Sequence, residues 1–179
     1  MNRIAVALIF VLVFTGLTSK DALAQCKQQL VYSCATENGR AIYLRDFNAK
    51  LKKSKPGKPA FVARFSVVLN KGTRYRLNLC NPNGYEDRTM LILYDAKKEY
   101  GKTFYTAEEA GKQGVLELVK KNYKPEEYSV LPDGGIMLQK FDFVCEKSGV
   151  YFVAIQYMDG FTDRKGCAVG ILSFVGKNK

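Results

Sequence analysis

Apolar and polar residues alternate along most of this chain, and the alternation predicts β-strands. Every second side chain from residue 61 to 69 is apolar, and residues 73–80 repeat the pattern with Tyr75, Leu77 and Leu79 on one face. A period of two is typical of a strand that buries one side. The same criteria, together with short apolar runs between turn residues, predict strands at 30–32, 41–44, 90–94, 140–145, 150–157 and 167–175.

Residues 96–135 interrupt this rhythm. Thr106 and Glu109 have the spacing of a helix capping box, whereas the apolar cluster at 115–119 follows neither period. We therefore predict an insertion that forms one short helix or an irregular hairpin. Residues 50–59 contain two prolines and a glycine and are predicted to be an exposed loop. The pattern as a whole predicts an all-β fold, an antiparallel sandwich that forms a single domain over residues 25–179.

The first twenty-four residues have the pattern of an export signal. Arg3 precedes an apolar run from Ile4 to Leu17, and Ala22-Leu23-Ala24 has the small residues that a signal peptidase recognises. The run is shorter than the ~20 residues of a membrane-spanning helix. We expect removal of residues 1–24 and a mature chain without a transmembrane segment, located in the periplasm or outside the cell.

A lipoprotein is the alternative form of export. Cys26 follows Leu23-Ala24-Gln25, which is similar to the box that precedes an acylated cysteine in bacterial lipoproteins, although Gln25 departs from it. Acylation at Cys26 would anchor the protein to a membrane.

Positive charge gathers in one part of the chain. The formal net charge is +11, and residues 40–64 hold eight basic side chains against one acid, Asp46. Such a stretch can meet an anionic partner or can serve solubility alone. Export makes nucleic acid an unsuitable partner, so an acidic polysaccharide or a protein is expected. The candidate anionic-surface residues are Lys50, Lys52, Lys53, Lys55 and Lys58.

The chain has no histidine, which excludes Ser-His-Asp and Cys-His catalysis and the usual zinc triads. Cys80 and Cys145 have charged neighbours but are interpreted as structural, and Asp159 and Asp163 are interpreted as turn residues and not as metal ligands. We expect no catalytic residues, no metal and no cofactor. The alternative is a secreted hydrolase that uses carboxylates alone.

Aromatic side chains collect in and beside the insertion, where a loop can present flat apolar faces to sugar rings or to a protein. They can equally pack the insertion onto the sandwich. The sequence therefore predicts an exported, non-catalytic binding or structural module that engages a macromolecule of the envelope or the extracellular space. Its candidate ligand-binding residues are Tyr100, Phe104, Tyr105, Tyr123 and Tyr128.

Three segments together resemble the pre-peptidase C-terminal domain, a β-sandwich appended to secreted bacterial proteins. They are residues 65–75, with a glycine turn between two strands, Leu91–Asp95, and Ser148–Ile155. The resemblance covers residues 61–175 and implies a jelly-roll-like sandwich without catalytic residues. The family's calcium site is not expected, because residues 48–60 contain no acid.

The resemblance also implies a disulfide. In that sandwich the strand at residues 73–80 pairs antiparallel with the strand at 167–175. Such a register places Leu79 opposite Ala168 and Cys80 opposite Cys167, at a separation that a disulfide can bridge. We therefore predict a Cys80–Cys167 bond. The remaining cysteines, Cys26, Cys34 and Cys145, then form at most one further pair.

Overall fold

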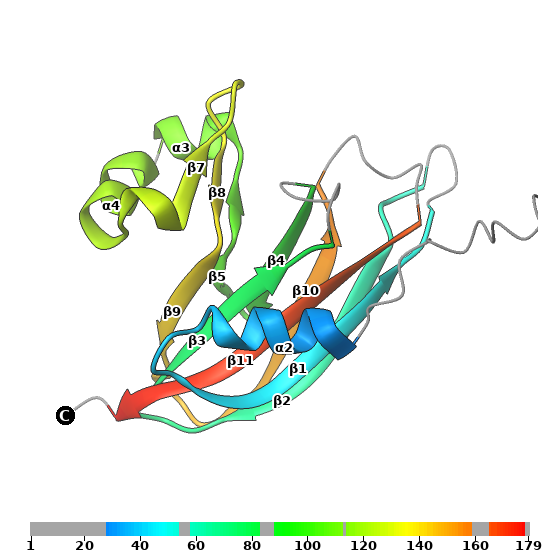
Figure 1. Ribbon diagram of the computed structural model, residues 1–179. Coiled ribbons are helices and arrows are strands. Elements are labelled where there is room, and N and C mark those ends of the chain that lie inside the picture. The colour runs from blue at the N-terminus through cyan, green and yellow to red at the C-terminus, as the bar shows by residue number, and fades with distance from the viewer. Residues whose placement is uncertain (1–27, 54–57, 83–87, 113, 159–164, 178–179) are drawn as a thin grey trace, which may run out of the picture.

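Two antiparallel four-stranded sheets pack face to face in the computed structural model, which describes residues 28–53, 58–82, 88–112, 114–158 and 165–177 (Figure 1). Sheet A has the strand order β1-β11-β3-β9, and sheet B has the order β2-β10-β4-β5. The predicted all-β sandwich is confirmed. The strands are β1 Ile42–Leu51, β2 Val62–Leu69, β3 Thr73–Cys80, β4 Thr89–Tyr94, β5 Glu99–Lys102, β9 Lys140–Val144, β10 Gly149–Tyr157 and β11 Gly166–Lys177.

Alternating side chains build the core between the two sheets. Leu77 pairs with Leu172 in sheet A, and Leu93 pairs with Val153 in sheet B. All four are at most 2% exposed. Because the strands bury every second residue, the period of two in the sequence becomes one continuous apolar layer.

Successive strands change sheet, as in a jelly roll. β1 lies in sheet A, β2 in sheet B, β3 in sheet A and β4 in sheet B, and β9, β10 and β11 alternate in the same way. The C-terminal strand β11 therefore lies between β1 and β3. Its outer face is as buried as its inner face, since Val169 and Ile171 are fully buried.

Helix α2, Gln28–Thr36, covers that outer face of sheet A (Figure 1). The predicted strand at residues 30–32 is therefore wrong. Leu30, Val31 and Cys34 recur at the spacing of three to four residues that places them on one side of a helix, and they pack against β11. Gly39, with φ of 63°, lies in the turn that leads from the helix into β1.

The segment from residue 103 to 138 forms a lobe above the sandwich (Figure 1). The predicted insertion at 96–135 thus begins later, because β5 belongs to sheet B. One short helix or an irregular hairpin was predicted, and the described residues contain two short α-helices as well as antiparallel pairing of residues 128–130 with 136–138. The capping box is confirmed by hydrogen bonds between Thr106 and Glu109. The lobe contains β6 Phe104–Tyr105, α3 Ala107–Lys112, α4 Val115–Asn122, η2 Pro125–Glu127, β7 Tyr128–Val130 and β8 Ile136–Leu138.

The predicted Cys80–Cys167 bond is wrong. Strand β3 pairs antiparallel with β11 as expected, but Cys80 lies opposite Val169, and Leu79 lies opposite Gly170. The register is two residues away from the predicted one. A shift of two keeps every side chain on its own face, so the hydrophobic pattern alone cannot distinguish the two registers.

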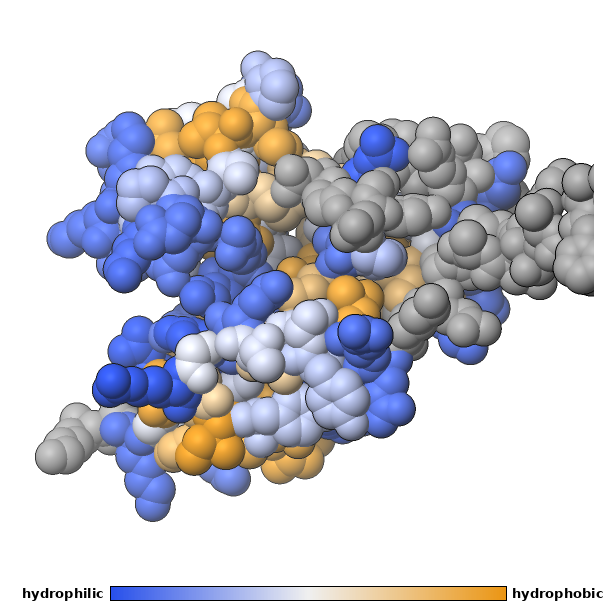
Figure 2. Space-filling model, in the orientation of Figure 1, coloured by the Kyte–Doolittle hydropathy of each residue, from blue (hydrophilic) through white to orange (hydrophobic). Residues whose placement is uncertain are grey.

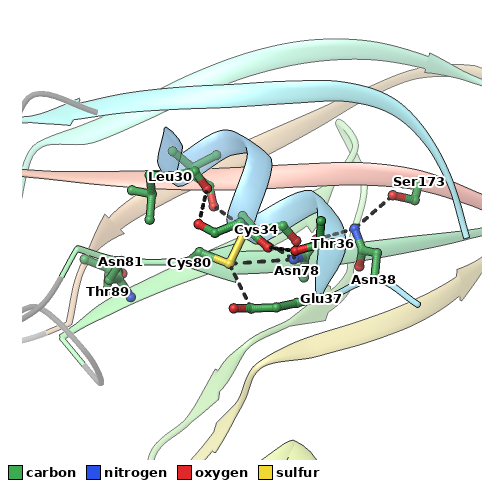
Figure 3. Close-up of a disulfide and its surroundings, with 12 residues drawn as sticks. Leu30, Cys34, Thr36, Glu37, Asn38, Asn78, Cys80, Asn81, Thr89 and Ser173 are labelled. Atoms are coloured by element: carbon green, nitrogen blue, oxygen red, sulfur yellow. Dashed lines mark hydrogen bonds between the residues drawn. A yellow bond between two sulfur atoms is a disulfide. The ribbon is translucent and has the colours of Figure 1, made fainter. Parts of the chain in front are cut away.

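Cys80 is bonded instead to Cys34 of α2, with a Cα–Cα distance of 5.7 Å (Figure 3). Cys167 is also disulfide-bonded. Among the cysteines of the described ranges, Cys145 keeps a free and buried thiol. None of the helices in these ranges is long and apolar enough to cross a membrane. Residues 1–24 and Cys26, on which the export predictions depend, lie outside the described residues.

Candidate functional site

Helix α2 is fixed to sheet A by a buried polar network beside the disulfide (Figure 3). The Asn38 side-chain amide donates to Asn78 Oδ1 at 2.8 Å and to Ser173 Oγ at 2.9 Å. The Asn78 amide in turn donates to the Cys34 carbonyl at 2.9 Å. These contacts give partners to the amide hydrogens of Asn38 and Asn78, which would otherwise be costly to bury, and they hold the helix in one position on the sheet.

A groove of about 700 Å³ lies between α2 and the edge strand β1. Phe47, Ala49 and Leu51 of β1 point into the core, so Asp46 and Asn48 point outward beside the helix. We call this hollow the tyrosine groove. It is lined by Gln28, Val31, Tyr32, Ala35, Tyr43, Asp46 and Asn48.

Two tyrosines form the exposed walls of the tyrosine groove. Tyr32 is 63% exposed and Tyr43 is 45% exposed, and their neighbours Ile42 and Leu44 are also largely exposed. None of these side chains belongs to either buried core. Exposed apolar side chains that gather around a hollow are typical of a binding surface.

A carboxylate gives the tyrosine groove its polar character. Tyr43 donates its hydroxyl hydrogen to Asp46 Oδ1 at 2.5 Å, and the Asn48 amide donates to Asp46 Oδ2. The hydrogen bond to Asp46 raises the pKa of Tyr43, because the carboxylate accepts the phenolic hydrogen. The groove thus presents two aromatic faces, one carboxylate and amide groups in a small space.

The predicted basic residues begin on the same strand and continue beyond its end. Lys50 lies two residues beyond Asn48 on the outward face of β1, so the predicted loop begins after Leu51 and not at residue 50. Lys52, Lys53 and Lys58 are exposed, and Lys52 Nζ lies 5.4 Å from the centre of the Phe61 ring. Lys55 lies outside the described residues.

Most of the aromatic residues predicted to bind a ligand pack instead against the core. The Tyr100 ring lies 5.1 Å from that of Phe143 and 5.2 Å from that of Tyr151, and its hydroxyl donates to Asp95. Tyr105 and Tyr128 contact the core cluster, and Phe104 is half-buried. Their role as ligand-binding residues stays a prediction.

Tyr123, the remaining member of that predicted set, lines a cleft of about 340 Å³ between the lobe and sheet A. Figure 2 shows hydrophilic side chains around the space that separates the lobe from the sandwich. We call it the charged cleft. It is lined by Arg74, Arg76, Asn122, Tyr123, Glu127, Lys140 and Asp142.

The ionisation of Tyr123 should make the stability of the protein depend on pH in the alkaline range. Burial raises the pKa of Tyr123 to about 12, above the ~10 of a free tyrosine. The folded state therefore holds this proton more tightly, so the contribution to stability is complete below pH ~10 and is lost as the pH rises towards ~12. We expect Tyr123→Phe to make the decline of stability over this range less steep. Urea unfolding at a series of pH values measures the free energy of unfolding of both proteins. The same decline with pH in the variant and in the unaltered protein would contradict the prediction.

Comparison with protein-family models, with curated proteins and with solved structures found no significant match to this chain. The resemblance to the pre-peptidase C-terminal domain remains a prediction from its three strand segments. Within the described residues, no three His, Cys, Asp or Glu side chains lie together as a metal site would require. Tyr32 and Tyr43 were not predicted as site residues, because no pattern in the sequence indicates that these two tyrosines of α2 and β1 lie beside the same hollow.

Proposed function

We propose that this protein is an exported, non-catalytic module that binds an acidic polysaccharide along the outer surface of β1. The observation that carries the proposal is the tyrosine groove, with its exposed aromatic walls, next to Lys50 on the same strand and to Lys52 and Lys53 just beyond its end. The Cys34–Cys80 bond supports export, because disulfides persist in oxidising compartments outside the cytoplasm.

The tyrosine groove has the chemistry that a sugar ring requires. The apolar C–H face of a pyranose can stack on the flat rings of Tyr32 and Tyr43. Asp46 can accept hydrogen bonds from ring hydroxyls, and the Asn48 amide can donate to them. At about 700 Å³ the hollow holds one or two sugar residues, since ligand pockets span roughly 300–1,000 Å³.

The lysines select for negative charge on the ligand. Lys50, Lys52 and Lys53 follow the groove along the end of β1, and the whole chain carries a net charge of +11. A carboxylated polymer that enters the groove with one sugar would bring its neighbouring carboxylates to these lysines. A neutral polymer would gain the stacking but none of this attraction.

Replacing both groove tyrosines tests the proposal. We expect the double variant Tyr32→Ala, Tyr43→Ala to weaken binding to polygalacturonate by at least ~10-fold. The variant loses the stacking of the sugar on both rings, and a sugar that no longer stacks also loses its hydrogen bonds in the groove. Neutral dextran should bind more weakly than polygalacturonate to the unaltered protein. Affinity electrophoresis in gels that contain either polymer, or isothermal titration calorimetry, measures both differences.

The matched control lies on the outer face of the other sheet. Val68 and Val150 are cross-strand neighbours of β2 and β10, exposed by 69% and 55%, and their joint replacement by alanine should leave binding unchanged. Equal losses in both double variants would overturn the proposal. If the protein binds no polygalacturonate but captures another protein through the two tyrosines, the partner is a protein and the polysaccharide proposal is wrong.

The lysines give a separate expectation. Exposed charges are screened within ~8 Å at physiological salt, so binding of polygalacturonate should weaken steeply as sodium chloride is added. Replacing Lys50, Lys52 and Lys53 with serine should flatten this salt dependence while stacking on the tyrosines persists. If the slope with salt is the same in the triple variant, these lysines serve solubility only.

A further inference from the structure

The charged cleft is lined by one more basic side chain than acidic side chains. Its charged members are Arg74, Arg76 and Lys140 against Glu127 and Asp142. The cleft lies across α2 from the tyrosine groove, because Arg74 and Arg76 project from β3 on the same outer face of sheet A. It is separate from the site proposed for the polysaccharide.

Asp142 is already paired without Arg74. The Nε and Nη2 atoms of Arg76 contact the two carboxylate oxygens of Asp142 at 2.7 Å and 3.1 Å, a bidentate arrangement. The hydrogen bond to Asp142 raises the pKa of Arg76. Arg76 also donates to the Asn38 carbonyl at 3.3 Å, so its guanidinium is held in place from both sides.

Glu127 is likewise occupied. One of its oxygens contacts Lys140 Nζ at 3.0 Å, and the other accepts a hydrogen bond from the Lys124 backbone at 3.1 Å. These contacts lower the pKa of Glu127, with the backbone hydrogen bond as the largest cause. Both acids of the cleft therefore have full sets of partners that do not depend on Arg74.

Arg74 is the cation in surplus. Its side chain is 51% exposed, and it touches Asp142 through Nη2 at 2.7 Å, on an oxygen that Arg76 also binds. Turning Arg74 away from Asp142 would leave the bidentate Arg76 pair intact. Its planar guanidinium has further N–H groups, in the geometry that suits two oxygens of a carboxylate or phosphate.

Tyr123 and Asn122 add neutral donors to the same cleft. Tyr123 carries a protonated phenol near neutral pH, as an ordinary tyrosine does, and this hydroxyl can donate a hydrogen bond to an anion. The Asn122 amide uses one hydrogen for the Leu118 carbonyl at 2.8 Å and has a second to offer. We propose that the charged cleft binds one small oxyanion, a carboxylate or a phosphate, between Arg74 and Tyr123.

Titration of the whole protein with inorganic phosphate or with monomeric galacturonate tests this site. At constant ionic strength, ¹H–¹⁵N spectra should show saturable shifts for the amides of residues 74, 76, 122 and 123 with at least one of these probes. We expect Arg74→Gln to weaken that binding by at least ~10-fold, because it removes the surplus charge. Tyr123→Phe should weaken it by several-fold.

Arg64→Gln is the matched control, since Arg64 is an exposed arginine on β2 of the other sheet. It removes the same charge and should leave the affinity unchanged. Equal weakening by Arg64→Gln and Arg74→Gln would show general attraction to a basic protein and would overturn the proposal. The absence of saturable shifts in the cleft with either probe would overturn it as well. Binding of polygalacturonate through the tyrosine groove is measured with other variants, so the two proposals fail independently.

Discussion

Replacing Cys34 and Cys80 together with serine is expected to lower the free energy of unfolding by about 4 kcal/mol. The bond joins residues separated by 46 positions, and closing a loop of this length removes much of the freedom of the unfolded chain. Cys34 is also fully buried and packs against Val169 and Ile171, so its replacement also disturbs the contact between α2 and β11. Urea unfolding of the oxidised protein and of the double variant measures the difference.

The control for this prediction is Cys145→Ala, which removes the free buried thiol and leaves the disulfide in place. A loss of only about 1 kcal/mol is expected there. Similar losses in both variants would contradict the stabilising role of the bond. Peptide mapping under non-reducing conditions adds a direct check, since a fragment that links Cys80 to a cysteine other than Cys34 would contradict the pairing itself.

Phe47→Ala is expected to lower the free energy of unfolding by about 3–5 kcal/mol, the range for a large buried side chain whose loss leaves a cavity. Phe47 is fully buried, and its ring lies 5.4 Å from that of Phe65 in the facing sheet. Its cross-strand partner is Gly170, where a Cβ would lie within 3.4 Å of the Phe47 ring. The space at Gly170 is taken chiefly by Leu91 and Ile155, whose Cδ1 atoms would lie 2.8 Å and 3.1 Å from such a Cβ, and the Phe47 ring packs beside them.

Phe152→Ala provides the comparison, because Phe152 lies on the outer face of β10 and is only half-buried against Tyr94. We expect Phe152→Ala to lower the free energy of unfolding by about 1.5 kcal/mol or less, since no closed cavity forms. Urea unfolding curves of the two variants, recorded under the same conditions, measure the difference. Equal losses would show that the Phe47 ring is not at the centre of the core.

The sequence was sufficient for the strands of the sandwich but not for the segment that covers it. Residues 73–80 were predicted with their boundaries, because alternation along a half-buried strand is unambiguous. Leu30, Val31 and Tyr32 were predicted to form a strand, since three adjacent apolar residues fit either period. The helix becomes recognisable only when Cys34 is included, and its apolar side needs β11 as a partner.

The disulfide shows a second kind of limit. Pairing of β3 with β11 was predicted correctly, yet the register was two residues away from the true one. Both registers bury Leu77 and Leu79 equally well, so packing preference alone did not decide between them. The true partner, Cys34, lies on a helix that crosses the sheet, and no local pattern links that helix to Cys80.

The candidate sites were reached only in part from the sequence. Lys50, Lys52 and Lys53 were selected because charge is visible in composition, and Tyr123 because it belongs to an aromatic cluster. Tyr32 and Tyr43 were not selected, since each is an isolated tyrosine in the chain. Their shared groove exists only because α2 lies beside β1.

The position of β11 in the middle of sheet A has a consequence for the order of folding. β1 forms its sheet pairing with β11, near the other end of the chain, and β3 needs β11 on one of its sides. Sheet A can therefore be completed only when β11 is in place, and closing such long loops slows the search for the native pairing. Pairings between strands that follow each other closely, such as β4 with β5, need no such long loop and can form before sheet A is complete.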